Sequence, residues 1–420
     1  MRDNSTKKGK RVSERSLLVA VDIAKLRHVG YWRCPDGTES KPFEFFNTGQ
    51  GFQRFWEIIC HSKEKFALEE VVVGFESTGA YAEPLLHFLR KRGVRMVQVN
   101  PVHTKRLREL TGNSPGKTDE KDPKVIADIM ELGHALTVII PEGSAAELRR
   151  LTNARERSLQ RRTALLNQVQ DLVFMLFPEF LEVMKGVKSR SAQYLLAHCP
   201  TPERVIQKGL EELTREIKKI SRGKLGRERA QRLYEAASGS VGIPEGRNSI
   251  VLEIVEDLSS IEAIEQFIGK VEKEMIVHLG KIPYSRWILS IKGIGPVTVA
   301  GLIGEIGDFR QFRTVSEILK QAGMDLFEIS SGKRKGRRRI SKRGRALLRK
   351  LLFYAALNTV RKGGVMRRYY RRYLERGMPG KKALIAVARK LLRIIFALVR
   401  DHKAFVRDDF TTNYQLKEAA

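Results

Sequence analysis

The sequence is poor in cysteine, in long apolar segments and in acidic residues. Its three cysteines, Cys34, Cys60 and Cys199, are odd in number and widely spaced. They predict no disulfide framework or zinc cluster, and they indicate a reducing, cytoplasmic setting. The apolar runs fall short of a membrane span, and the N-terminus is basic and polar without an apolar signal core. We therefore expect no membrane partner.

Acidic residues are strongly outnumbered. The 420 residues include 78 Lys and Arg against 48 Asp and Glu, which leaves a formal charge of +30 and a pI near 10.2. A field of this sign attracts polyanions, and neutralisation of phosphates dominates nucleic-acid affinity. Nucleic acid is therefore the first partner to consider. The length predicts about two to three domains.

Residues 16–140 have the pattern of a mixed α/β domain, preceded by a basic disordered arm at 1–15. The predicted elements are strands at 17–23, 28–33 and 41–46, a helix at 51–62, a strand at 71–76, a helix at 81–92, and a strand at 94–99. A last helix follows residue 117. Three strands joined by hairpins and then alternating helices and strands indicate a ribonuclease H-like layout, with a turn predicted at Cys34–Gly37.

Four acids stand at the ends of these elements. Asp22 closes the strand pattern L-L-V-A-V-D and Glu76 closes V-V-V-G-F-E, while Asp119 and Asp122 lie three residues apart where a glycine-rich loop becomes helical. Residues three apart share a helix face. Aspartates in a first helical turn are also common caps, which is the plainer interpretation of that pair. Together the four carboxylates predict a two-metal site for phosphoryl transfer.

Residues 144–282 are predicted to be a helical connector. Ser144 and Glu147 form a capping-box pattern that opens a helix reaching about residue 176. Its interrupted apolar stripe is flanked by arginines, as in a coiled coil within the chain or between protomers. A charged helix packed on its own domain fits equally well. Further helical segments continue to 282, with breaks near 200, 223–226 and 239–246.

A mostly helical C-terminal domain is predicted at 283–405, followed by a tail at 406–420. Lys292, Gly293 and Gly295 precede a helix and resemble a helix-hairpin-helix element, which grips a nucleic-acid backbone; a plain tight turn is the alternative. Nine of the thirteen residues at 333–345 are Lys or Arg. The basic candidates for phosphate binding are Lys333, Arg334, Lys335, Arg337, Arg338, Arg339, Lys342 and Arg343. A solvated tail is the usual alternative for such a run.

Three more helices are predicted, at 343–361, 366–376 and 381–400. The last has an apolar stripe typical of a core-facing helix. The stripe consists of Leu384, Val387, Leu391, Ile394, Ile395 and Leu398. Tyr369, Tyr370 and Tyr373 stand among arginines, a pattern that fits contacts to nucleic acid and ordinary packing equally.

Several motifs resemble those of the DEDD transposases, insertion-sequence recombinases with a RuvC-like domain that are related to pilin-gene invertases. They are V-D-I-A-K at 21–25, E-S-T-G-A-Y at 76–81, N-P at 100–101 and K-T-D-E-K-D at 117–122. The resemblance implies that Asp22, Glu76, Asp119 and Asp122 bind Mg²⁺, with Mn²⁺ as a substitute. Pro123 departs from the family pattern, although proline suits a first helical turn.

The segment from Gly323 through the Ser-Gly step resembles the C-terminal transposase domain of the same family. The resemblance places a serine nucleophile at Ser331, with Ser330 as the rival position. It also implies donor and target DNA as partners, a structured guide RNA encoded by the element, and a composite site in a dimer to tetramer. The basic run that follows Ser331 departs from the polar, glycine-rich family pattern.

Three other functions remain open on the residues alone. A junction-resolving nuclease would use the same acids with a metal-activated water as nucleophile. A non-enzymatic nucleic-acid binder would need only the basic charge. A sugar kinase of ribonuclease H-like fold is disfavoured by that charge and by the lack of paired glycine-rich phosphate loops.

Overall fold

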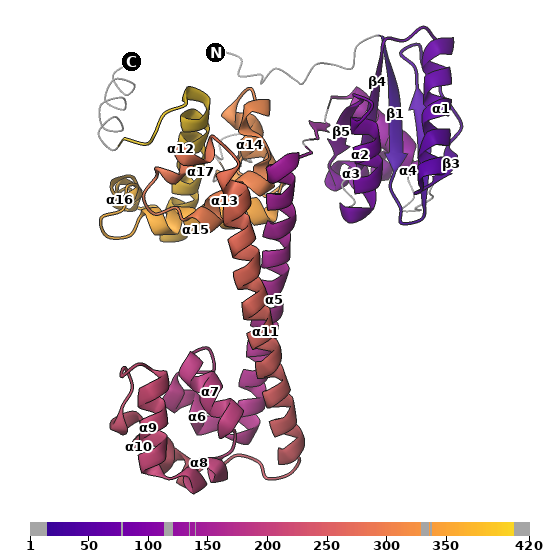
Figure 1. The fold of residues 1–420 in the computed structure, drawn as a ribbon. Coiled ribbons are helices and arrows are strands. Elements are labelled where there is room, and N and C mark those ends of the chain that lie inside the picture. Colours follow the sequence, from indigo (N-terminus) through magenta and orange to yellow (C-terminus); the bar gives the residue numbers. More distant parts are fainter. Residues whose placement is uncertain are drawn as a thin grey trace. The chain divides into compact units, whose positions relative to one another are not determined.

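The computed structural model describes residues 15–76, 79–112, 121–133, 135–138, 140–328, 336 and 338–406. The chain divides into two compact units, Met1–Ile140 and Pro141–Ala420. The first is mixed α/β and the second is almost entirely helical (Figure 1). This confirms the predicted combination of an N-terminal α/β domain with a helical remainder.

A six-stranded mixed sheet forms the centre of the first unit. Its strands are β1 (Ser16–Asp22), β2 (Arg27–Arg33), β3 (Phe43–Phe46), β4 (Glu70–Glu76), β5 (Arg95–Val99) and β6 (Leu136–Thr137). They lie in the order β3-β2-β1-β4-β5-β6, with β1, β4 and β5 parallel and the other pairs antiparallel. The five predicted strands and the predicted turn are present, and the turn is closed by a hydrogen bond from Gly37 N–H to the Cys34 carbonyl (3.1 Å). The two-residue β6 was not predicted.

Helices cover both faces of this sheet. They are α1 (Gly49–Lys65), α2 (Glu83–Arg90) after a short 3₁₀ turn, η1 (Gly79–Ala82), then α3 (Pro101–Gly112) and α4 (Lys121–Glu131). Helices α1 and α2 pack on the face that carries Val19, Val21 and Phe75. Helix α4 packs on the opposite face, against Leu18 and Val72. The sequence prediction missed α3.

Two 34-residue helices dominate the second unit. Helix α5 (Gly143–Leu176) and helix α11 (Arg247–Gly280) lie side by side in Figure 1. They are antiparallel, because Arg155 pairs with Glu272 (2.7 Å) and Arg162 with Glu265 (3.3 Å). The two helices thus pair within the chain, while a coiled coil stays a prediction.

The predicted capping box at the start of α5 is wrong. The N-cap residue is Glu142 and the helix begins at Gly143, two residues earlier than a cap at Ser144 requires. The Glu142 carbonyl accepts hydrogen bonds from the N–H groups of Ala145 (3.1 Å) and Ala146 (3.3 Å). Ser144 is therefore already inside the first turn, where its side chain cannot cap the helix.

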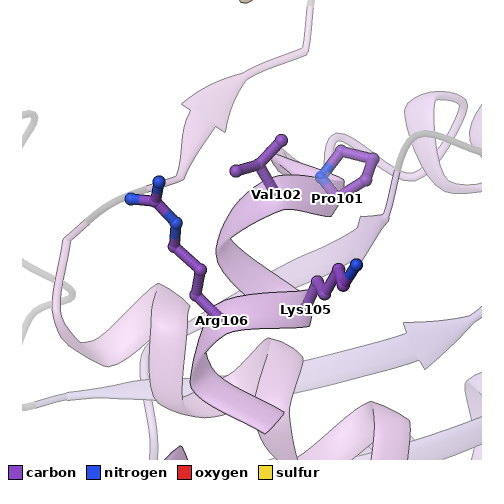
Figure 2. Close-up of a pocket in the computed structure, with 4 residues that line it drawn as sticks. All are labelled: Pro101, Val102, Lys105 and Arg106. Carbon is purple, nitrogen blue, oxygen red and sulfur yellow. The ribbon is translucent and has the colours of Figure 1, made fainter. Parts of the chain in front are cut away.

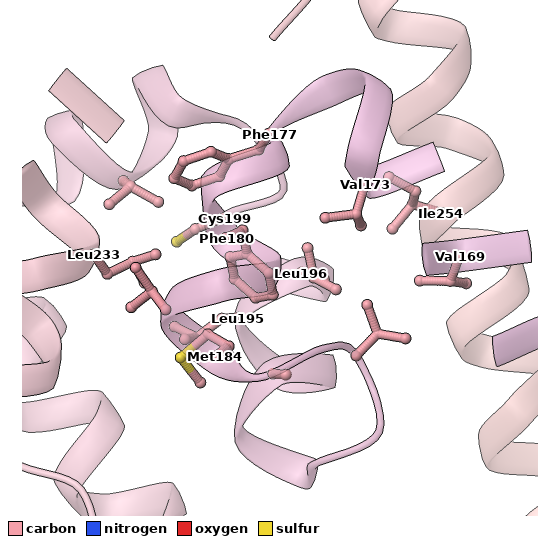
Figure 3. Packing of buried hydrophobic residues seen from close by; sticks show 14 of the residues in the cluster. Val169, Val173, Phe177, Phe180, Met184, Leu195, Leu196, Cys199, Leu233 and Ile254 are labelled. Atoms are coloured by element: carbon pink, nitrogen blue, oxygen red, sulfur yellow. The ribbon is translucent and has the colours of Figure 1, made fainter. Parts of the chain in front are cut away.

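The segment between the two long helices folds into a compact helical module. It contains α6 (Pro178–Met184), α7 (Arg190–His198), α8 (Pro202–Lys208), α9 (Leu210–Ile220) and α10 (Arg227–Ser238). Figure 3 shows its core, in which Phe180, Leu196 and Leu233 meet Val173 of α5 and Ile254 of α11. The chain breaks fall where they were predicted, but the helices form a core rather than a simple connection.

The C-terminal part of this unit is a second helical cluster. Its elements are α12 (Ser285–Leu289), α13 (Pro296–Ile306), η2 (Phe309–Gln311), α14 (Val315–Gln321), the hairpin strands β7 (Leu326–Phe327) and β8 (Arg339–Ile340), α15 (Ala346–Thr359), α16 (Arg367–Glu375) and α17 (Gly380–Asp401). The predicted stripe of α17 is buried apart from Leu398, which is half-buried. This confirms its core-facing role. Within the described part of the chain, no helix is both long enough and apolar enough to cross a membrane.

Candidate active site

Asp22 and Glu76 end two neighbouring parallel strands. Val21 of β1 pairs with Phe75 of β4, so the next residue on each strand is an acid at the same edge of the sheet. Side chains alternate along a strand. Because Val21 and Phe75 belong to the core under α1 and α2, Asp22 and Glu76 point to the opposite face, which is the face covered by α4.

Helix α4 brings Asp122 toward the same edge. Its first turn contains Asp122, whose side chain is almost fully buried. Asp128, later in the helix, accepts a hydrogen bond from Arg33 (2.8 Å), and Arg33 lies opposite Leu18 in the amino half of β1. The end of α4 therefore lies over the amino half of β1. Its beginning, with Asp122, points toward the carboxyl ends of β1 and β4.

A network of ion pairs holds α4 on the sheet. Besides Asp128, Arg33 contacts Glu131 (3.0 Å) and Glu39 (3.3 Å), and Lys124 contacts Glu39 (2.8 Å). The Lys124 ammonium, together with the Tyr31 hydroxyl, lowers the pKa of Glu39 to about 2. Arg33 is mostly buried, so these contacts fix the orientation of α4 better than exposed pairs would.

Gly74 allows α4 to pack this closely. It lies on β4, two residues before Glu76, and a Cβ atom at this position would stand 2.1 Å from the Met130 sulfur. Met130 is itself buried in the core between α4 and the sheet. A glycine inside a strand often marks such a close approach. Here it sets the distance between the helix that carries Asp122 and the strand that carries Glu76.

Glu76 is held by a residue of α3. The Thr104 hydroxyl lies 3.0 Å from Glu76 Oε2 and 2.9 Å from the Pro101 carbonyl oxygen, and Thr104 is buried. Asn100 starts the helix, because its Oδ1 accepts a hydrogen bond from Val102 N–H (2.9 Å). The helix therefore places a hydroxyl beside one carboxylate of the sheet edge.

The outer side of α3 is basic. A hollow of about 450 Å³ is lined by Pro101, Val102, Lys105 and Arg106 (Figure 2). The Lys105 and Arg106 side chains are exposed and extend from the helix in different directions. Since α3 starts directly after β5, this positive charge lies close in the chain to the carboxylate edge.

The turn after Asp22 is fixed by a buried histidine. His28 Nδ1 accepts a hydrogen bond from Ala24 N–H (3.1 Å), and the ring stacks on Phe52. Burial lowers the pKa of His28. The ring therefore stays neutral, and its Nδ1 remains able to accept the bond that shapes this turn.

The predicted phosphate-gripping turn follows α12. Lys292, Gly293 and Gly295 are exposed, and Gly295 is the N-cap of α13. Gly293 has a φ of +101°, a conformation that favours glycine, and a Cβ atom there would lie 3.4 Å from the Asn358 carbonyl oxygen of α15. The turn is thus backed by a helix end on one side and open to solvent on the other.

The base of the basic loop is closed by hydrogen bonds between its two strands. Ser341 N–H donates to the Asp325 carbonyl (2.9 Å) and Ser341 Oγ donates to Asp325 Oδ1, while Lys342 N–H donates to the Gly323 carbonyl (2.9 Å). Arg338, Arg339, Lys342 and Arg343 are exposed near this base. Ser331 and its rival Ser330 lie outside the described residues, as do Lys333, Arg334, Lys335, Arg337 and Asp119.

Two family models match the chain. A transposase model of the DEDD type matches residues 19–178, and the model described as the transposase IS116/IS110/IS902 family matches residues 285–371. The first contains the carboxylate edge and the second contains the glycine turn and the basic loop. The chain belongs to the DEDD-type insertion-sequence transposases.

Relatives of the transposase come from other insertion elements. The 44.8 kDa protein of IS116 from Streptomyces clavuligerus is 25% identical over 339 residues, 80% of this chain and 84% of the relative. The 43.6 kDa protein of IS110 from Streptomyces coelicolor is 23% identical over 390 residues, 92% and 94% of the two chains. The 42 kDa protein of IS900 from Mycobacterium paratuberculosis is 24% identical over 338 residues, 80% and 84%. The resemblance therefore extends over most of the transposase.

The carboxylates of the transposase match the chemistry of a hard divalent cation, which prefers oxygen ligands. The Thr104 hydroxyl on Glu76 is the kind of outer contact that orients a metal ligand. Among the residues that the structure describes, no three His, Cys, Asp or Glu side chains come together closely enough to hold a metal ion. Asp119, the fourth predicted acid, is not among them.

Sequence reasoning missed the residues that support the carboxylates. Thr104, Arg33 and Gly74 carry no motif of their own. The Asn100-Pro101 pair could have revealed α3, because an Asn followed by Pro is a strong helix start. It would not have shown which face of α3 meets Glu76.

Proposed function

We propose that this transposase cuts and rejoins the DNA strands of an insertion sequence through a covalent link between DNA and Ser331. The observation that carries the proposal is the carboxylate edge of the sheet, supported by the family match of both blocks. Asp22 and Glu76 end adjacent parallel strands on the face that α4 covers, and α4 directs Asp122 toward them. We take the sheet order as that of a ribonuclease H-like, RuvC-like domain.

The residues that would hold Mg²⁺, or Mn²⁺ in its place, are Asp22, Glu76, Asp119 and Asp122. When bound there, the ion would lower the pKa of an attacking hydroxyl and stabilise the leaving oxygen. Lys105 and Arg106 on the exposed side of α3 supply positive charge that favours approach of a phosphate to this acidic edge.

The serine step conserves the phosphodiester bond energy. The Ser331 oxygen forms a bond to phosphorus, the P–O ester bond of the DNA strand breaks, and the leaving oxygen takes up a proton. In the reverse step a DNA hydroxyl attacks the phosphoserine and restores Ser331, so strands are rejoined without ATP. A serine hydroxyl needs activation for this, and the nearest histidines in the chain are distant in sequence, at His278 and His402.

The proposal includes a structured RNA encoded by the element and an oligomer of two to four chains. Base pairing to that RNA would choose donor and target DNA, while the protein binds backbone and shape, as in other RNA-guided systems. The exposed Lys292 and the exposed base of the loop, Arg338 to Arg343, are suited to such contacts because phosphate binding requires charge but no base readout.

The decisive test uses cells that carry the gene with its native flanking DNA. Junctions between the joined element ends are scored by PCR for the parent, Ser331→Ala and Asp22→Ala. We expect junctions from the parent alone, and a covalent protein–DNA adduct in denaturing gels that is absent in both variants. Purified parent and variants should bind element DNA equally well, since neither change removes a phosphate contact.

The alternative function is a junction-type endonuclease that uses a metal-activated water. It shares the acids but needs no serine. If Ser331→Ala still forms junctions while Asp22→Ala does not, the serine mechanism is wrong and the endonuclease is the better description. If Ser330→Ala, but not Ser331→Ala, removes the adduct, the nucleophile is Ser330.

A further inference from the structure

Helices α16 and α17 carry a dense run of cationic residues. Between residues 367 and 393 there are ten Lys and Arg but a single acid, Glu375. The two helices pack against each other (Figure 1). On α16 the rings of Tyr369 and Tyr373 meet edge to face at 4.9 Å, with their hydroxyl oxygens 2.7 Å apart. No residue of α16 is fully buried, and Tyr369 and Tyr373 are partly exposed.

Arg389, on the second of these helices, has an unused donor. It is half-buried on α17, and its Nε is shielded from solvent without a hydrogen-bond partner among the described residues. Burial lowers the pKa of Arg389, and the like charge of Arg393, one helical turn further, lowers it again. Tyr373, Tyr369 and Asp325 raise this pKa.

Such an arrangement is costly without a ligand. A shielded donor that makes no hydrogen bond loses its hydration without compensation. Two neighbouring guanidinium groups repel each other unless an anion lies between them. An arginine offers five donors in a planar fork that matches the oxygens of a phosphate, and tyrosine hydroxyls add further donors.

We propose that Arg389 and Arg393, with the Tyr369–Tyr373 pair, bind a phosphate of the DNA backbone. DNA is chosen because the block that matches the transposase family, residues 285–371, includes both Tyr369 and the β7–β8 hairpin that leads to the proposed nucleophile. The choice of DNA rests on the proposed function, whereas phosphate binding itself does not.

The test measures affinity for a duplex with the terminal sequence of the element over a range of salt concentrations. We expect Arg389→Gln and Arg393→Gln each to weaken DNA binding about tenfold. The salt slope, which is the steepness with which log affinity falls with log salt concentration, should decrease by about 0.9 in each variant because one phosphate contact is lost. Arg400→Gln is the matched control, because Arg400 lies on the same helix but pairs with Asp401 (2.6 Å). It should leave affinity and slope as in the parent.

Thermal unfolding separates binding from a structural role. Because Arg389 has a shielded, unpartnered donor, Arg389→Gln should keep or raise the midpoint of the DNA-free protein. A lowered midpoint together with an unchanged salt slope would show that Arg389 is structural and overturn the proposal. If Arg389→Gln fails to fold, Arg393→Gln tests the proposal alone, because Arg393 is exposed. A salt dependence of DNA affinity equal to that of the parent in this variant would refute the site.

A second arm replaces the duplex by an RNA transcribed from the element's flank. If only RNA affinity falls in the two variants, the assignment to DNA is wrong. Loss of DNA affinity with the Ser331 adduct still forming at saturating DNA would support the site. If the adduct forms neither in the parent nor in the variants, the serine mechanism is wrong. The proposal that Arg389 and Arg393 bind phosphate is not affected by that result.

Discussion

The α/β unit and the C-terminal cluster of the transposase differ sharply in charge. Residues 16–140 contain 17 Lys and Arg and 16 Asp and Glu, a net charge of +1. Residues 283–405 contain 30 and 7, a net charge of +23, which is most of the +30 of the chain. The near-neutral α/β unit places a few acids by packing, whereas the C-terminal cluster attracts phosphate through many cations.

This difference separates two physical tasks. Carboxylates that hold a metal, as we propose for Asp22, Glu76, Asp119 and Asp122, need fixed positions because ligand geometry decides affinity. Thr104, Arg33 and Gly74 make contacts that fix the elements carrying the described acids. Phosphate binding needs mainly charge, and several exposed cations can share it. Substitutions in the first region should therefore alter the rate of strand cleavage and its dependence on metal concentration. Substitutions in the second region should alter the salt dependence of DNA binding.

The largest effect in this comparison is expected for Thr104→Val. The change keeps the shape of the side chain but removes the hydroxyl beside Glu76 Oε2. Loss of an outer contact to a metal ligand typically costs about 10- to 100-fold in metal affinity or activity. We expect the Mg²⁺ concentration for half-maximal strand cleavage to rise by this factor, with an unchanged salt slope of DNA binding.

Thr104→Ser is the control for that variant, because serine keeps the hydroxyl and should retain most of the parental metal response. Equal metal responses in the valine variant and the parent would mean that Thr104 does not orient a metal ligand. The distinction between an α/β unit that fixes metal ligands and a C-terminal cluster that binds phosphate would then lose its main support.

A smaller effect is expected for Gly74→Ala. The added Cβ must displace the buried Met130, which pushes α4 away from β4. Overpacking of this kind typically costs about 1 to 3 kcal/mol. Urea unfolding should show the loss, and strand cleavage should slow because Asp122 moves relative to Glu76.

Gly49→Ala provides the comparison, since a Cβ at that position meets nothing within 4 Å. It should leave the free energy of unfolding unchanged or raise it by up to about 1 kcal/mol. If both glycine variants unfold at the same urea concentration, the close approach of α4 at Gly74 does not constrain the site.

The smallest effect is expected for Lys292→Gln in the C-terminal cluster. Lys292 is exposed beside the glycine turn, so its loss should weaken DNA binding on all sequences alike and lower the salt slope by about 0.9. Cleavage of saturating DNA should proceed at the parental rate. Lys273 on α11 is also exposed, so Lys273→Gln is the control and should change neither the DNA affinity nor its salt slope. If the salt slope fell as much in this control, the effect of Lys292→Gln would be a general effect of charge.

The sequence predicted the elements of the α/β unit well because their patterns are strong and local. The runs before Asp22 and Glu76 are continuous apolar strands buried on both faces, as parallel strands require. Helix α3 was missed because its composition is mostly polar. Strand β6 was missed because two residues carry no periodicity. The α5 start was misplaced because Ser144 and Glu147 have cap-like spacing even inside a helix.

Three features could be predicted from the sequence alone: Asp22 and Glu76 close buried strands, the C-terminal cluster is strongly basic, and α17 turns an apolar face inward. Each of these features depends only on residues that lie close together in the sequence. Three other relations appear only in the folded protein: the two acids share a sheet face, α4 points Asp122 toward them, and Thr104 meets Glu76. These relations depend on strand register and helix packing, which join residues far apart in the chain.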